Sequence, residues 1–137
     1  MSNSADLRTA LIQSILNASL SYPIKWANAP FDTPTNETWL RVTPLYGQPQ
    51  PYSMTTTDRI DGVLQIDVFV PKGKGDLIGH QVADEIRQAL PVNAEKITQG
   101  AVSVQFLSVG VSGEDVEDAW YKTIISAQFY TFVDRTQ

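Results

Sequence analysis

The sequence predicts an α+β fold, in which a mostly antiparallel or mixed sheet of four to six strands carries two helices on one side. In the strand expected over residues 59–70, Leu64, Ile66, Val68 and Val70 point one way while Gln65 and Asp67 point the other, which is the period of a strand with one face in a core. Residues 76–90 repeat their apolar side chains with the period of an amphipathic helix. Residues 101–109 and 120–133 return to the alternation of strands. We therefore expect a single domain over residues 1–137, in which helices and sheet share one core.

The first element is predicted to be a helix over about residues 4–20, with the helix-starting side chains Ser4 and Asp6 near its beginning. It carries two apolar stripes on nearly opposite sides, whereas a surface helix of a monomer needs only one. One interpretation buries both stripes within the subunit or places Leu20 beyond the helix end. The other places one stripe on the subunit's own sheet and the second against a neighbouring molecule. The first stripe contains Leu7, Ala10, Leu11, Ile15 and Ala18, and the second contains Ile12, Leu16 and Leu20.

A short extended piece over residues 22–27 and a strand over residues 38–46 come next, and the strand places Leu40 and Val42 on one face. Residues 47–57, GQPQPYSMTTT, contain two prolines and no charge and show no periodicity, so we expect a long loop. Long loops inside compact domains are usually functional or disordered. The candidate contacts in and beside this loop are Tyr46, Tyr52 and Met54.

The second helix follows a glycine turn at Gly73 and Gly75, and Asp76 is expected to cap it. Pro91 stops it, because proline cannot continue a helix. The step from strand through helix to strand over residues 59–109 suits a right-handed crossover. The apolar face of this helix comprises Ile78, Val82, Ala83, Ile86, Ala89 and Leu90, and the shared core is expected to contain Ile66, Val68, Ile86, Phe106 and Phe129.

The last strand, over residues 120–133, has one apolar face and one mixed face. The mixed face is too apolar to stand fully in water and too polar for an ordinary core, which suits an interface with another molecule. The apolar face comprises Tyr121, Ile125, Ala127, Phe129 and Val133, and the mixed face comprises Trp120, Lys122, Ile124, Gln128, Tyr130 and Phe132.

No catalytic set or cofactor motif emerges from the residue pattern. His80, the single histidine, falls on the polar face of the second helix, where we expect a solvated side chain with Asp84 as its partner. Residues 71–76, PKGKGD, lack the Gly-Lys-Ser/Thr of a phosphate-binding loop. Residues 112–118 are expected to form a solvated acidic loop or a partner contact, and they lack the spacing of a calcium-binding EF-hand. The four carboxylates of this segment are Glu114, Asp115, Glu117 and Asp118. We expect no metal and no cofactor.

The composition restricts the classes of partner. A net charge of −5 argues against a general nucleic-acid binder and disfavours anionic membrane surfaces. No stretch is long and apolar enough to span a membrane, and the first 20 residues do not read as a secretory signal. The chain has no cysteine, which excludes disulfides, thiolate metal sites and a cysteine nucleophile.

Several stretches in succession resemble the phage tail terminator-like family, the small proteins that cap the tail tube of long-tailed phages. They are IKWANAPFDTP at 24–34, TWLRVTPLYGQPQP at 38–51, RIDGVLQIDVFVPKGKG at 59–75 with its helix, and the final strand opening at Trp120 and Tyr121. The resemblance implies a ring of six subunits in the virion tail, assembled in the host cytoplasm, that stops tube polymerisation and offers its other face to the head or neck. Its partners would be copies of itself, the major tail tube protein and a head-completion or neck protein, while DNA passes through without specific binding.

A protein of this kind has surfaces in place of an active site. The candidate subunit and tube contacts are Ile12, Leu16, Leu20, Tyr46, Tyr52, Met54, Trp120, Ile124 and Tyr130. Two other functions compete with this one. The first is another phage neck or tail-completion protein of similar fold, and the second is a small-molecule-binding or enzymatic α+β domain with a pocket between sheet and helices.

Overall fold

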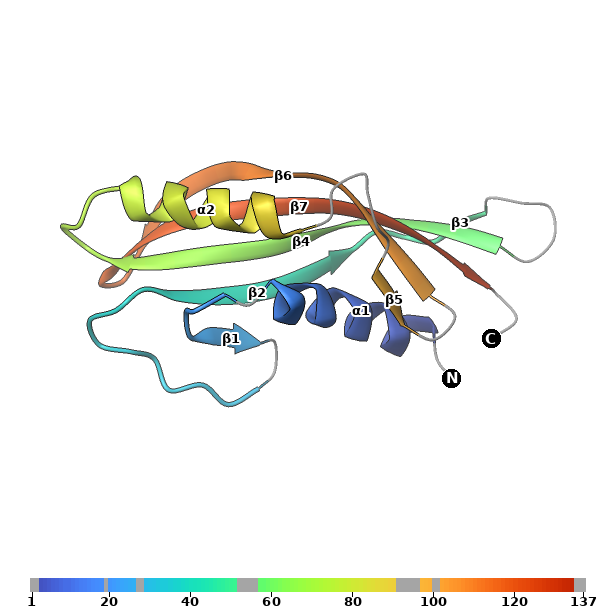
Figure 1. Ribbon diagram of the computed structural model, residues 1–137, viewed down its shortest axis with the longest axis horizontal. Helices are drawn as coiled ribbons and strands as arrows, with labels where there is room; N and C mark the ends of the chain where they lie inside the picture. Colours follow the sequence, from blue (N-terminus) through green and yellow to red (C-terminus); the bar gives the residue numbers. More distant parts are fainter. Residues whose placement is uncertain are drawn as a thin grey trace.

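The computed structural model describes residues 3–18, 20–26, 29–51, 57–90, 97–99 and 102–134. These parts form one sheet with two helices on the same face (Figure 1), which confirms the predicted α+β class. Neither helix is long and apolar enough to cross a membrane. The helices are α1 (Asn3–Asn17) and α2 (Leu77–Ala89). The strands are β1 (Ile24–Trp26), β2 (Trp39–Tyr46), β3 (Gln50–Pro51), β4 (Thr57–Pro71), β5 (Ile97–Gln99), β6 (Val102–Glu117) and β7 (Trp120–Asp134).

The sheet is mixed, as predicted. Its main path runs β1-β2-β4-β7-β6-β5, and the short β3 pairs with β4 beside this path. Only β1 and β2 pair in parallel among the described strands; the other pairs are antiparallel. The chain leaves β4 through α2, passes through the short β5 and enters β6, which runs parallel to β4 with β7 between them. The central ladder of β4 and β7 extends from Thr57 opposite Asp134 to Pro71 opposite Trp120.

The register brings the alternating apolar side chains of four strands onto the face beneath the helices. Ile66 of β4, for example, lies opposite Val42 of β2 on one side and Ile125 of β7 on the other. The core predicted from the sequence is confirmed, because each of its members is at most 1% exposed. These members are Ile66, Val68, Ile86, Phe106 and Phe129. The rings of Phe106 and Phe129 meet edge to face with centroids 6.4 Å apart.

The first helix is shorter than predicted. It ends at Asn17, and Leu20 lies beyond the helix and packs against the subunit's own core. The extended backbone that Pro23 favours at Tyr22 keeps the helix from continuing toward β1. Four members of the predicted inner stripe, Leu7, Ala10, Leu11 and Ile15, are buried, whereas Ala18 lies beyond the helix end and is half-buried. The second stripe therefore has two helical members, Ile12 and Leu16.

The second helix starts at the predicted turn, where Gly73 and Gly75 have φ of 89° and 79°. Asp76 occupies the N-cap position but makes no side-chain cap hydrogen bond, so its predicted capping role is wrong. Ala89 was predicted on the apolar face of α2 but is exposed in the last turn of the helix. Gly79, in the first turn, is buried. A Cβ there would lie 2.7 Å from the Cβ of Thr123, so its missing side chain lets α2 approach β7 closely.

The predicted acidic loop at residues 112–118 is wrong. The strand β6 continues through it to Glu117, and the chain turns only at Asp118 and Ala119, where Asp118 has a φ of 54°. This part of β6 lies at the edge of the described sheet, where charged side chains reach water while the backbone pairs with β7. A run of acids on a half-paired strand and a run of acids in a loop look the same in a sequence.

Candidate functional site

The predicted contacts on α1 differ in exposure. Leu16 is 54% exposed, whereas Ile12 is half-buried. Leu20 is half-buried and packs against the core, so the interpretation that places it past the helix end is the one that applies. Leu16 is thus the member of the second stripe that the subunit itself leaves most open.

The predicted contacts on β7 lie on the sheet face away from the helices, and the subunit partly covers each of them. Trp120 meets Trp39 edge to face with ring centroids 5.8 Å apart. Tyr130 has the guanidinium carbon of Arg59 4.3 Å from its ring centroid and the ring of Phe132 at 5.7 Å. Ile124 is half-buried beside Gly113 of β6.

An ion-pair network lies on this outer face, toward the turn between β6 and β7, and links β2, β4, β6 and β7. Arg41 donates from Nε and Nη2 to Oδ2 of Asp67, at 3.1 and 2.9 Å, and Gln65 donates to the other oxygen at 3.0 Å. Arg41 also reaches Glu117 at 3.3 Å, and Lys122 reaches the same carboxylate at 3.4 Å. The alternation of the sequence placed Arg41 and Asp67 on this face. Their pairing across two strands depends on the register and was not predicted.

The network makes stability depend on pH. Partial burial raises the pKa of Glu117, but the charges and hydrogen bonds of Arg41 and Lys122 outweigh it, so the pKa is lowered overall. A carboxyl whose folded pKa lies below its unfolded value stabilises the fold above the unfolded value, and this contribution is lost as pH falls through the folded pKa. We expect Glu117→Gln to lower the urea midpoint slightly at pH 7 and to leave it unchanged at pH 2–3. An equal loss at both pH values would contradict this role.

The four carboxylates at residues 114–118 do not form one cluster. In the register of β6 and β7, Asp115 lies opposite Lys122 and Glu117 lies opposite Trp120, both on the outer face. The side chain of Asp115 also accepts a hydrogen bond from the backbone N–H of Val116. Glu114 lies opposite the buried Thr123, on the side of the sheet that carries the helices. Asp118 lies in the turn.

Glu114 instead joins two side chains at the start of α2. Nε2 of His80 lies 2.9 Å from Oε1 of Glu114, so the expected partner of His80, Asp84, is corrected to Glu114. One ligand atom each from Asp76, His80 and Glu114 lie within 4.8 Å of one another. The spacing of Asp76 and His80, four residues apart on a helix, was visible in the sequence. The contribution of Glu114 was hidden by the prediction of an acidic loop.

Among the residues that the structure describes, the sheet has open edges on both sides. Residues Val102–Val104 of β6 pair with β5, and no described residue pairs with the outer edge of β6 from Gln105 onward. On the opposite side, β1 covers β2 only from Leu40 to Val42. The exposed large apolar side chains along these edges are Leu107, Val111 and Val116 on β6 and Leu45 and Tyr46 on β2. Tyr52 and Met54 lie outside the described residues.

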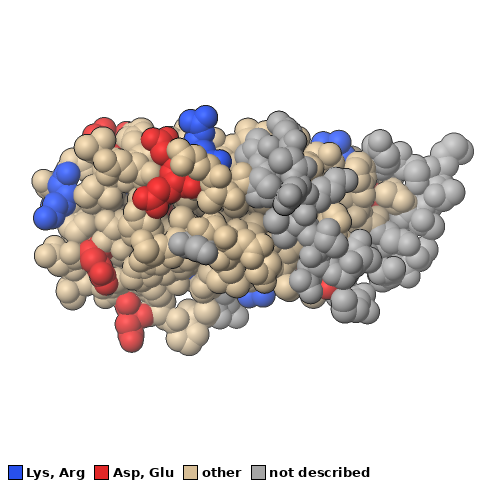
Figure 2. Space-filling model, viewed as in Figure 1, with Lys and Arg blue, Asp and Glu red and all other residues tan. Residues whose placement is uncertain are grey.

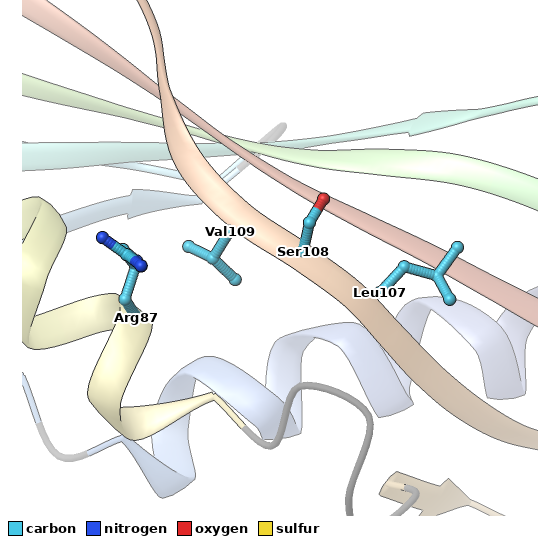
Figure 3. Close-up of a pocket in the computed structure, with 4 residues that line it drawn as sticks. All are labelled: Arg87, Leu107, Ser108 and Val109. Carbon is cyan, nitrogen blue, oxygen red and sulfur yellow. The ribbon is translucent and has the colours of Figure 1, made fainter.

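A hollow of about 280 Å³ lies between α2 and β6, and Arg87, Leu107, Ser108 and Val109 line it (Figure 3). These side chains supply one guanidinium and one hydroxyl, a set without a pair for proton transfer. Figure 2 shows that the described charged side chains stand in small groups on a largely uncharged face.

Comparison with known proteins shows the relationships of the chain. A family model described as phage tail terminator protein matches residues 6–129. A solved structure superposes with a TM-score of 0.73 at 22% sequence identity, covering 96% of this chain and 96% of the other, which shows a shared fold. No curated protein sequence matches.

Proposed function

This chain belongs to the phage tail terminator protein family, and from this membership we propose that it forms a six-membered ring that caps the tail tube. The family places it among the structural proteins of the phage tail. In the proposed role the ring stops polymerisation of the major tail tube protein and presents its other face to a head-completion or neck protein. The match over residues 6–129 is the observation that carries the proposal.

The open edges of the sheet supply surfaces from which a ring can close. A ring uses two different patches of each subunit, since each subunit contacts one neighbour on either side. The edge of β6 and the end of β2 that no described strand covers lie on opposite sides of the same sheet. Each exposes backbone groups that can extend a neighbour's sheet, together with the apolar side chains Val111 and Val116 or Leu45 and Tyr46.

The helix α1 and the outer face of β7 supply further contacts. Leu16 is a large apolar side chain that α1 leaves exposed to solvent among polar neighbours. The mixed face around Tyr130 resembles the composition of protein interfaces, which are rich in aromatic residues and arginine. The net charge of −5 suits a lumen through which DNA passes without adhering.

The test is tail assembly with charged substitutions in these surfaces. Leu16→Asp and Val111→Asp each place a carboxylate where the ring would bury an apolar side chain, which costs several kcal/mol if the charge stays unpaired, and Tyr130→Asp removes the aromatic ring from the mixed face. We expect overlong tails without heads, visible by negative-stain electron microscopy of phage complemented with each variant. Gln88→Asp adds the same charge at an exposed polar position of α2 and should give normal phage.

Three other results would contradict parts of this proposal. Folded variants that all yield normal tails joined to heads would refute the interface assignment. A phage that lacks the whole chain and still makes tails of normal length would refute the terminator function. If those tails lacked heads, the function would shift to that of a neck protein.

A further inference from the structure

We infer that Asp76, His80 and Glu114 form a binding site for a divalent transition-metal ion such as Zn²⁺. One ligand atom from each residue lies within 4.8 Å of the others, and Nε2 of His80 is already 2.9 Å from Oε1 of Glu114. Ligand atoms around a tetrahedral Zn²⁺, with bonds of about 2.0–2.2 Å, lie a little over 3 Å apart. The three atoms thus stand close to the spacing that one bound ion requires.

The local structure leaves each of these groups available. Asp76 stands at the N-cap position, yet its carboxylate makes no cap hydrogen bond. His80 is one helical turn further on, and its backbone N–H bonds the carbonyl of Asp76 at 3.4 Å, which fixes the two side chains on the same side of α2. Glu114 comes from β6, so the site joins the start of the helix to the edge of the sheet.

Tyr121 supports the position of Glu114 from the neighbouring strand. Its side chain hydrogen-bonds Glu114, and with Asp76 it lines a hollow at the start of α2. A hydrogen bond to a ligating carboxylate orients it and tunes its affinity for the metal. A hollow of about 450 Å³ beside Asp76 and Tyr121 leaves room for water at the open coordination positions.

The donor set selects the class of ion. One imidazole nitrogen with two carboxylates suits Zn²⁺, Co²⁺ or Ni²⁺, whereas Mg²⁺ and Ca²⁺ prefer oxygen ligands alone. The two carboxylates also balance the charge of a divalent ion. A bound ion would hold the start of α2 against the β6–β7 hairpin and stabilise the folded state by mass action.

The experiment titrates chelator-treated full-length protein with ZnCl₂ by calorimetry and follows the melting temperature in parallel. We expect one Zn²⁺ per chain, a higher melting temperature with Zn²⁺, and no such rise with the same concentration of MgCl₂. The test is clean because the chain contains one histidine and no cysteine, so no second imidazole or thiolate competes.

Matched variants locate the site. His80→Ala and Glu114→Gln should weaken Zn²⁺ binding at least tenfold, and Tyr121→Phe should weaken it about 10-fold or more while retaining all three ligands. Asp84→Asn removes an exposed carboxylate from the same helix one turn beyond His80 and should bind Zn²⁺ like the wild type. Without metal, His80→Ala should melt close to the wild type because the side chain is exposed.

Two results would overturn the assignment. One is a wild-type protein without saturable Zn²⁺ binding, which would leave His80 and Glu114 as a plain hydrogen-bonded pair. The other is His80→Ala and Glu114→Gln binding Zn²⁺ as tightly as the wild type. The absorption of bound Co²⁺ gives an independent readout, because its visible bands should shift or vanish in His80→Ala if the imidazole is a ligand.

Discussion

Phe129→Ala is expected to lower the free energy of unfolding by about 3–5 kcal/mol, the usual range for truncating a buried phenylalanine. The ring is 1% exposed and packs edge to face against Phe106. Its Cζ would lie only 2.6 Å from a Cβ at Gly62, so the ring fills the space that this glycine leaves. Removing the ring leaves a cavity at the junction of β4, β6 and β7, where paired strands on both sides of β7 hinder collapse.

Urea denaturation at neutral pH measures this effect. Gln128→Ala is the matched control, because Gln128 is the preceding residue of the same strand and is exposed. It should change the free energy of unfolding by less than about 0.5 kcal/mol. A Phe129→Ala variant that is native-like and melts at the wild-type temperature would show that the face assigned to β7 is wrong.

Arg41→Met is expected to cost about 3 kcal/mol, because it leaves the carboxylate of Asp67 without its cation. Asp67 is fully buried, with 0% exposure, and Arg41 donates two hydrogen bonds to one of its oxygens. The guanidinium also lies over the ring of Phe69, with 4.9 Å between its central carbon and the ring centroid. Methionine keeps most of the aliphatic stem and removes the charge, so packing changes little.

Two further variants separate the causes of this loss. Arg59→Met removes an arginine from the same sheet face whose partner Asp61 is 57% exposed, and it should cost about 1 kcal/mol or less. The double variant Arg41→Met with Asp67→Leu should recover much of the stability, since an apolar pair can replace a buried ion pair. If Arg41→Met lowered the free energy of unfolding no more than Arg59→Met does, groups other than Arg41 would stabilise the buried carboxylate of Asp67, and the role assigned to Arg41 would be wrong.

The sequence by itself determined the elements whose patterns are local. Alternation in Leu64, Ile66 and Val68 and the period of Val82 and Ile86 fixed which side chains face the core, because burial of apolar area decides orientation at each position. The glycine turn before α2 followed from two residues that tolerate positive φ. The same local patterns, taken in succession, carried the family resemblance that the match over residues 6–129 bears out.

Only the tertiary structure decided which side chains meet across strands. The pairing of Arg41 with Asp67, the contact of His80 with Glu114 and the burial of Gly79 against Thr123 depend on register and on the approach of α2 to the sheet. Residues 112–117 form a strand because β7 supplies hydrogen-bond partners, a condition that their own composition does not reveal. Contacts between residues far apart in the chain are set by the free energy of the whole packed sheet, so no local pattern records them.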